Sequence, residues 1–94
     1  MESIGTQLRT LLNAPEILIT PGVFDGFSAR LVERAGFRTG TISGAGVSES
    51  RLGWADRGIM GFEDNLANAR RLAECTDLLL QADADTGYGN ALNV

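Results

Sequence analysis

The apolar residues of this chain follow two periods that alternate along the sequence. Apolar residues spaced three or four positions apart predict amphipathic helices, and short continuous apolar runs predict buried strands. Helices are therefore expected from Ser3 to Asn13, from Asp25 to Gly36 and from Phe62 to Cys75, and strands at Ile17–Ile19, Thr39–Ser43 and Leu78–Ala82.

Polar residues, proline and glycine mark the ends of these elements. Pro15 ends the first helix, Asp25 is suited to cap the second, and Gly36 follows its last turn. The polar, glycine-containing stretch 47–61 predicts a long loop with room for one helical turn. The residues expected to face the core are Leu31, Val32 and Ala35 in the second helix, and Leu66, Ala69 and Ala73 in the third.

The order of elements after the first helix is strand, helix, strand, helix, strand. This alternation predicts an α/β fold with parallel strands joined by right-handed crossovers. In such folds the ligand site lies at the carboxyl ends of the strands. Functional residues are therefore expected at Pro21–Asp25, at Ser43–Gly46 and at Asp83–Asn90.

Composition limits the chemistry that this chain can perform by itself. Its 94 residues correspond to one small domain or to part of a larger one, and they contain neither Lys nor His. A Ser-His-Asp triad, an imidazole zinc site, a Schiff base and a P-loop lysine are therefore excluded within the chain. The net charge is −4, and the whole deficit falls within residues 63–94. A pI near 4.6 argues against nucleic-acid and anionic-membrane partners.

The remaining composition favours a soluble, cytoplasmic protein. No apolar run approaches the roughly 20 residues that span a bilayer. The amino terminus lacks the basic start and apolar stretch of a secretory signal. The alternative to a cytoplasmic location is a compartment reached by a signal that this chain does not contain. The single Cys75 cannot form an internal disulfide, and we expect it to be a small buried apolar residue rather than a nucleophile.

The sharpest local motif is Asp83-Ala-Asp85-Thr-Gly-Tyr-Gly-Asn90. Two carboxylates at i and i+2 beyond a strand can both approach a divalent cation, and hard oxygen ligands suit Mg²⁺ or Mn²⁺. The alternative is a solvated acidic turn, but the preceding strand and the following glycines favour a site. An EF-hand fits poorly, because Tyr88 stands where that loop requires glycine and Val94 where it requires glutamate.

Two further segments are candidates for binding. Ser43-Gly-Ala-Gly46 offers a hydroxyl and unobstructed backbone N–H groups at a strand end, which suits a carboxylate or phosphate, although a simple Ser-Gly turn has the same sequence. A dinucleotide-binding loop is excluded because no third glycine follows. Asp56 lies in the polar loop and matters only if that loop folds back over the metal; otherwise it is a solvated surface residue.

Together these motifs resemble a known superfamily. The ordered set Pro21-Gly-Val-Phe-Asp25 with Ser28-Ala29, Ala35-Gly36-Phe37, Ser43-Gly-Ala-Gly46 and Asp83–Asn90 is similar to the isocitrate lyase/phosphoenolpyruvate mutase superfamily. The nearest resemblance is to methylisocitrate lyase, dimethylmalate lyase, oxaloacetate hydrolase or decarboxylase, and carboxyphosphonoenolpyruvate mutase. The resemblance extends from about Pro21 to the last residue.

The resemblance implies a fold and a reaction. Residues 1–94 would form the N-terminal fragment of a single (β/α)₈ TIM barrel, with about three parallel strands and their helices. The activity implied is a Mg²⁺-dependent carbon–carbon lyase (Mn²⁺ is the alternative ion). Its substrate would be a small 2-hydroxy or 2-oxo dicarboxylic or tricarboxylic acid, such as methylisocitrate, cleaved through a metal-stabilised enolate.

The resemblance also assigns roles to individual residues. Ser43, Gly44 and Ala45 would grip the carboxylate and oxygen of the substrate, and Asp83 and Asp85 would hold Mg²⁺ directly or through water. Asp56 would lie in the outer shell of the metal and orient its waters. Full-length relatives would form homotetramers.

The chain departs from the family pattern in one important respect. The lyases carry a Lys-Lys-Cys-Gly-His segment whose Cys acts as acid or base, and nothing in this sequence matches it. A complete barrel needs roughly 250 residues. The isolated chain is therefore expected to be inactive, with its acid/base residue beyond Val94. A truncated non-catalytic fragment and a mutase or decarboxylase of the same superfamily stay open as alternatives, and a metal-dependent nucleotide-sugar binder ranks far behind.

Overall fold

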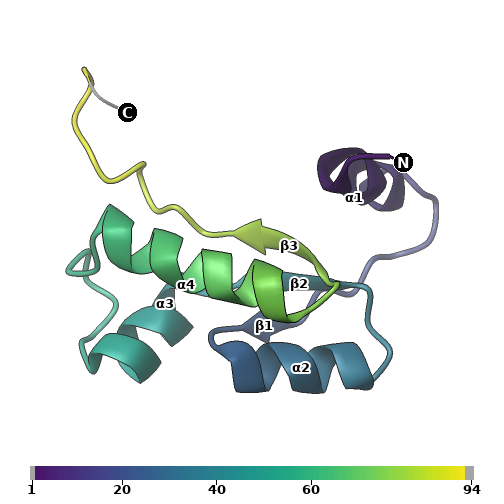
Figure 1. Cartoon of the computed structure of the whole chain (residues 1–94). Helices are drawn as coiled ribbons and strands as arrows, with labels where there is room; N and C mark the ends of the chain where they lie inside the picture. Colours follow the sequence, from purple (N-terminus) through teal and green to yellow (C-terminus); the bar gives the residue numbers. More distant parts are fainter. Residues whose placement is uncertain (1, 93–94) are drawn as a thin grey trace.

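Three parallel strands form the centre of the protein in a computed structural model that describes residues 2–92. The strands lie in the order β1-β2-β3, so each pairs with its neighbour in sequence (Figure 1). This arrangement confirms the predicted α/β class. The elements in chain order are α1 (Ile4–Leu12), β1 (Gly22–Val23), α2 (Gly26–Arg34), β2 (Thr39–Ile42), α3 (Gly44–Val47), the π-helical turn η1 (Ser48–Leu52), α4 (Phe62–Cys75) and β3 (Leu79–Ala82).

The first strand lies later in the sequence than predicted. The apolar run that was expected to form it has no regular secondary structure, and Ile17 and Ile19 are 89% and 62% exposed. Pairing begins at Pro21, whose carbonyl accepts a hydrogen bond from the Thr41 N–H, and continues as Gly22↔Thr41 and Val23↔Ile42. Proline is tolerated here because its missing N–H is lost only from the first position of the strand.

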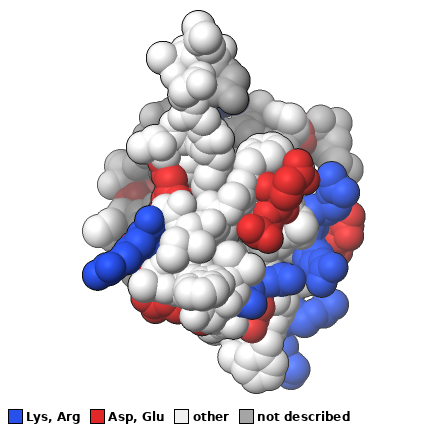
Figure 2. All heavy atoms as spheres, turned by 90° about the vertical axis from the view of Figure 1, so that its left-hand side faces the viewer, with Lys and Arg blue, Asp and Glu red and all other residues white. Residues whose placement is uncertain are grey.

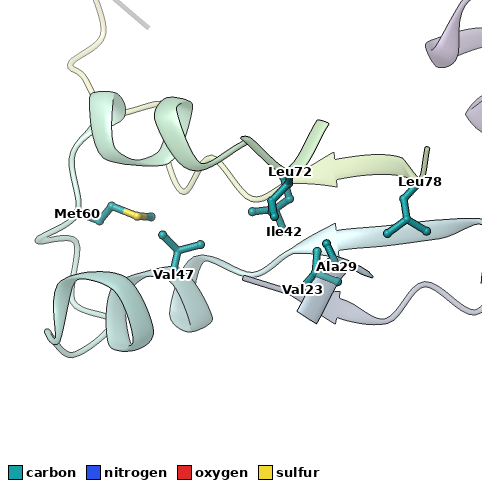
Figure 3. Packing of buried hydrophobic residues seen from close by; sticks show 7 residues of the cluster. All are labelled: Val23, Ala29, Ile42, Val47, Met60, Leu72 and Leu78. Atoms are coloured by element: carbon teal, nitrogen blue, oxygen red, sulfur yellow. The ribbon is translucent and has the colours of Figure 1, made fainter. Parts of the chain in front are cut away.

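The two faces of the sheet differ in polarity. Successive side chains of a strand point to opposite faces, so Val23 and Ile42 share one face while Thr41 lies on the other. α2 and α4 pack against each other beside the apolar face, where Leu72 lies close to Ile42 (Figure 3). The core consists of Val23, Ala29, Ile42, Val47, Met60, Leu72 and Leu78. On the opposite face the hydroxyls of Thr20 and Thr41 lie 3.1 Å apart.

The caps of α2 confirm the positions predicted for its ends. The Asp25 carboxylate accepts a hydrogen bond from the Ser28 N–H at 2.8 Å, and the Ser28 hydroxyl accepts one from the Asp25 N–H at 3.1 Å. At the other end Gly36 has a φ of +99°, and the Phe37 N–H donates to the Val32 carbonyl. This pair of features is a Schellman motif, which favours glycine at that position.

The buried faces of α2 and α4 were only partly predicted. In α2 the buried residue is Ala29, whereas Leu31 is 54% exposed. In α4 the buried residues are Asn65, Asn68 and Leu72, whereas Leu66 is 39% exposed. The apolar stripe is rotated because both asparagines find hydrogen-bond partners inside the protein, which offsets the cost of burying an amide.

The segment expected to be a long loop is helical over its first part. Ser43 caps α3, which begins at Gly44 and continues directly into η1. Gly53 ends η1 with a φ of +73°, and residues 53–61 then form an irregular connection to α4. The prediction allowed one helical turn, but polar residues that face solvent do not interrupt a helix whose Val47 and Leu52 pack against the core.

Cys75, the last residue of α4, is half-buried rather than fully buried, and its Sγ lies 3.8 Å from the Leu72 carbonyl oxygen. A methyl group on Gly26 would lie 3.7 Å from the same sulfur. Over the described part of the chain, no helix is long and apolar enough to cross a membrane.

A candidate metal and carboxylate site

The ends of β2 and β3 meet at the carboxyl edge of the sheet. Ile42 pairs with Ala82, and the Asp83 N–H continues the ladder by donating to the Ile42 carbonyl at 3.2 Å. The segments that begin at Ser43 and Asp83 therefore leave the sheet next to each other. Figure 2 looks onto this end of the molecule and shows a largely uncharged central area bordered by acidic and basic side chains.

Gly44 brings the two predicted motifs into contact. A Cβ built on Gly44 would lie 2.9 Å from Oδ2 of Asp83 and 3.7 Å from Oδ1 of Asp85. The 2.9 Å approach of the Asp83 carboxylate is closer than a Cβ allows without a shift, whereas the 3.7 Å distance to Asp85 is an ordinary contact. The structure thus places Gly44 with Asp83 and Asp85, although 39 residues separate Gly44 from Asp83 in the sequence.

The acidic loop that follows β3 is a tight turn. The Asp85 N–H donates to Oδ1 of Asp83 at 2.9 Å, and the Gly87 N–H donates to the Ala84 carbonyl at 2.8 Å. Asp85 and Tyr88 both have left-handed backbone conformations, with φ of +47° and +60°. Non-glycine residues adopt this conformation at a cost, and such residues are concentrated at functional sites.

Asn65, which the sequence did not indicate, joins the site together with Tyr88 of the acidic motif. The Asn65 side chain on α4 donates from Nδ2 to the Asp83 carbonyl at 2.8 Å and to the Tyr88 hydroxyl at 2.9 Å. Burial raises the pKa of Tyr88, the negative charges of Asp85 and Asp83 raise it further, and the hydrogen bond from Asn65 opposes them. The Tyr88 phenol therefore stays protonated beside the carboxylates. The amphipathic pattern of α4 predicts that Asn65 faces solvent. The residues around Asn65 therefore do not indicate that it belongs to the site.

Ser43 and the start of α3 form the second part of the site. The Ser43 Oγ accepts a hydrogen bond from the Gly46 N–H at 3.0 Å. The N–H groups of Gly44 and Ala45 lie in the first turn, where no helical carbonyl is available to accept them. A Cβ on Gly46 would lie 2.9 Å from the Phe24 Cβ, so this glycine is required for packing. Amides of this kind are free to bond to a group outside the helix.

The other two predicted segments do not join this cluster. Asp56 lies exposed in the irregular segment 53–61. Over residues 2–92, no three acidic or cysteine side chains come together as a metal-binding group. Asp25 also follows a strand, but its carboxylate is engaged in capping α2.

The carboxylate pair fits Mg²⁺ by the chemistry of its donors. Asp83 and Asp85 are both exposed to solvent, and they supply hard oxygen ligands. Mg²⁺ binds to one or two carboxylates in proteins and keeps several of its waters. A residue larger than glycine at position 44 would displace the Asp83 carboxylate. Two protein ligands and an open, solvated face therefore meet the needs of this ion.

The fold and this site define an α/β protein with carboxylates and helix-start amides at the end of parallel strands. A family model described as phosphoenolpyruvate phosphomutase matches residues 8–94. The chain therefore belongs to the phosphoenolpyruvate mutase/isocitrate lyase superfamily, which confirms the resemblance found in the sequence.

Relatives with known names cover nearly the whole chain. It is 36% identical over 90 residues to 2,3-dimethylmalate lyase of Eubacterium barkeri, covering 96% of this chain and 31% of that protein. It is 40% identical over 92 residues to 2-methylisocitrate lyase of Bacillus subtilis, covering 98% and 30%. It is also 40% identical to the chloroplastic carboxyvinyl-carboxyphosphonate phosphorylmutase of Arabidopsis thaliana, covering 97% and 27%. The chain thus spans about 30% of the length of these relatives.

Solved structures agree with this assignment. A crystal structure of 2,3-dimethylmalate lyase superposes with a TM-score of 0.84 at 42% identity, covering 95% of this chain and 32% of that one. Oxaloacetate acetylhydrolase in complex with 3,3-difluorooxalacetate superposes with a TM-score of 0.86 at 42% identity, covering 93% and 30%. The three-stranded unit described above is therefore an arrangement shared with these larger enzymes.

Proposed function

We propose that this chain forms the metal-binding and carboxylate-binding part of a Mg²⁺-dependent carbon–carbon lyase. The observation that carries the proposal is the approach of Asp83 and Asp85 to Gly44, at the edge where parallel α/β folds bind ligands. Two relatives named as lyases, which match 96% and 98% of this chain, support the reaction class. The proposed substrate is a small 2-hydroxy or 2-oxo dicarboxylic or tricarboxylic acid, such as methylisocitrate.

Each residue of the site has a separate task in this proposal. Asp83 and Asp85 hold the ion, directly or through water. Ser43, Gly44 and Ala45 bind the substrate carboxylate, for which the first-turn amides are suited. Bound Mg²⁺ would supply Lewis acidity, which stabilises negative charge on a substrate oxygen. Asp56 orients metal-bound waters in this proposal, a role that requires segment 53–61 to bring its carboxylate closer to the pair.

The remaining parts of the proposal concern the whole enzyme. The acid or base that moves protons during cleavage is expected outside residues 1–94, so the chain alone is expected to bind metal without turnover. A homotetramer and a cytoplasmic location belong to the same proposal. A phosphonopyruvate-type mutase or an oxaloacetate decarboxylase of the same superfamily is the second candidate, because a carboxyvinyl-carboxyphosphonate phosphorylmutase and an oxaloacetate decarboxylase are each 40% identical to this chain.

The metal site can be tested on the chain itself by Mn²⁺ binding, followed by electron paramagnetic resonance. We expect one bound ion in the wild type and at least a tenfold weaker affinity in Asp83→Asn and Asp85→Asn, since each change removes a charged ligand. Asp77→Asn is the matched control, because it makes the same change of charge at an exposed position before β3. Equal affinities in all four proteins would exclude this metal site.

The reaction can be tested in a chimera. This chain would replace the matching 30% of the Bacillus subtilis 2-methylisocitrate lyase. We expect Mg²⁺-dependent release of pyruvate from 2-methylisocitrate, dimethylmalate or oxaloacetate, and its loss in the Asp83→Asn chimera. A folded chimera that turns over none of these acids would refute the lyase and decarboxylase readings for this part of the chain.

A further inference from the structure

Asn65 is a buried polar residue whose side chain donates two hydrogen bonds to the acidic loop. Its side chain is only 6% exposed, on the face of α4 that packs toward the sheet. Its two hydrogen bonds reach the Asp83 carbonyl at 2.8 Å and the Tyr88 hydroxyl at 2.9 Å. Both donors come from one Nδ2 group, so a single amide joins the first residue of the loop to a residue five positions later.

The loop is exposed and strained, so the groups that hold it decide its shape. Residues 83–87 are exposed, and the loop contains the two left-handed residues Asp85 and Tyr88. Strained backbone of this kind persists only where the surroundings determine it. Tyr88 is held from a second side by Phe62, with ring centroids 6.2 Å apart and planes at 63°. Both anchors lie on α4, so the helix rather than the sheet edge holds the far end of the loop.

We propose that Asn65 is the positioning residue of the metal site. In this proposal, which rests on the proposed metal-binding function, Asn65 does not touch the ion. It fixes the Asp83 backbone and Tyr88 so that the Asp83 and Asp85 carboxylates stay directed at Gly44. Loss of these two hydrogen bonds keeps both carboxylates in the chain but allows the loop that holds them to change conformation. The metal affinity therefore falls.

The amide is used for its donors and not for its volume. Oδ1 of Asn65 is buried and has no hydrogen-bond partner within the described residues. Leucine has the same branching and the same number of side-chain heavy atoms, and it removes this unpaired acceptor, so Asn65→Leu should keep the fold. Asn65→Asp keeps the shape but replaces the donating group by a carboxylate oxygen, which would face the Asp83 carbonyl. Both variants should therefore weaken metal binding while differing in stability.

A matched control lies one turn further along α4. Asn68 is 1% exposed, donates to the Phe24 carbonyl at 3.1 Å and accepts a hydrogen bond from Arg51 at 2.7 Å. Asn68→Leu therefore removes a buried asparagine of the same helix face that holds other segments. Tyr88→Phe is the second test variant, since it removes one of the two Asn65 bonds and keeps the ring contact with Phe62.

The experiment measures two quantities on the full chain. Mn²⁺ affinity comes from electron paramagnetic resonance, and loop order comes from hydrogen exchange of the Asp85 and Gly87 N–H groups without metal, which are bonded within the loop. We expect about a tenfold weaker Mn²⁺ affinity in Asn65→Leu and Asn65→Asp, because losing a residue that orients metal ligands typically costs 10–100-fold. A smaller loss is expected in Tyr88→Phe and less than a twofold change in Asn68→Leu. Exchange of both amides should be fastest in the Asn65 variants, intermediate in Tyr88→Phe and unchanged in Asn68→Leu.

The outcomes separate this proposal from the proposed function. Wild-type affinity in a folded Asn65→Leu, or an equal loss in Asn68→Leu, overturns the positioning role. Absence of Mn²⁺ binding in the wild type refutes the metal site instead. In that case unchanged exchange in Asn65→Leu also overturns the anchoring of the loop, whereas faster exchange supports it independently of any metal.

Discussion

Replacing Gly44 by alanine should separate metal binding from stability. The added Cβ would lie 2.9 Å from Oδ2 of Asp83, and ordinary contacts begin at 3.4 Å, so the carboxylate must retreat by 0.5 Å. Protein ligands of a metal are held within about 0.2 Å of their proper distances. We therefore expect about a tenfold weaker Mn²⁺ affinity, equal to about 1.4 kcal/mol. The fold should tolerate the change, because the group that moves is the exposed end of a side chain.

The expected stability moves in the opposite direction. Gly44 is the first residue of α3 and does not have a left-handed φ, so alanine can adopt its backbone conformation. Gly-to-Ala changes at compatible positions stabilise by about 0.4–1 kcal/mol through the unfolded state. Thermal unfolding of Gly44→Ala should thus occur at the wild-type temperature or slightly above it, while calorimetric titration shows the loss of affinity.

Gly26→Ala is the control for this experiment. Gly26 holds the same position after the cap residue of α2, and a Cβ there would meet only the Cys75 sulfur at an ordinary 3.7 Å. It should gain a similar stability and keep the wild-type metal affinity. If Gly44→Ala and Gly26→Ala bind Mn²⁺ equally well, the close approach of Gly44 to the carboxylates does not shape the site.

Two further predictions concern the acidic loop and the core. Burial, then Asp85 and Asp83, raise the pKa of Tyr88 above 10.0, so its contribution to stability is complete below pH 10 and is lost as the pH rises through the folded pKa. Absorbance titration of this single tyrosine should show the raised pKa. The pKa should decrease when Mg²⁺ neutralises the carboxylates. A pKa at or below 10.0 in the folded protein would contradict the reasoning. Leu72→Ala should cost about 2–5 kcal/mol in urea unfolding. Leu66→Ala should cost less than about 1.5 kcal/mol, and equal costs would contradict the buried face assigned to α4.

Local sequence signals were sufficient for the ends of α2 and for the positions of β2 and β3. Asp25 and Gly36 were predicted as the limits of α2. A carboxylate at Asp25 can accept a hydrogen bond from a first-turn N–H, and glycine readily adopts the left-handed conformation that ends a helix. The predicted strand at Ile17–Ile19 was wrong, since apolar character alone does not provide a pairing partner. The segment that reaches β2 is the less apolar Gly22–Val23. Pairing is decided by the neighbouring strand and is not visible in the residues of the strand itself.

The candidate site was predicted in part for the same reason. The sequence placed Ser43–Gly46 and Asp83–Asn90 after strands at the edge where parallel α/β folds bind ligands, and the structure brings Gly44 and Asp83 together at that edge. Asn65 could not be found, because a polar residue in an amphipathic helix indicates solvent until its partners are known. Those partners are a backbone carbonyl and a hydroxyl some 20 residues away. Periodicity describes one helix at a time, whereas a buried amide depends on two segments together.

The pairing of Ile42 with Ala82 also ties sheet alignment to ligand geometry. If β3 slid by one residue along β2, every side chain of β3 would turn to the opposite face. Asp83 would then leave Gly44, and Leu79 and Leu80 would exchange surroundings. An error in alignment would thus abolish cation binding and core packing at once. A cation bound at the proposed site would accordingly favour the correct alignment over all others, and divalent ions would then act as folding ligands for this unit.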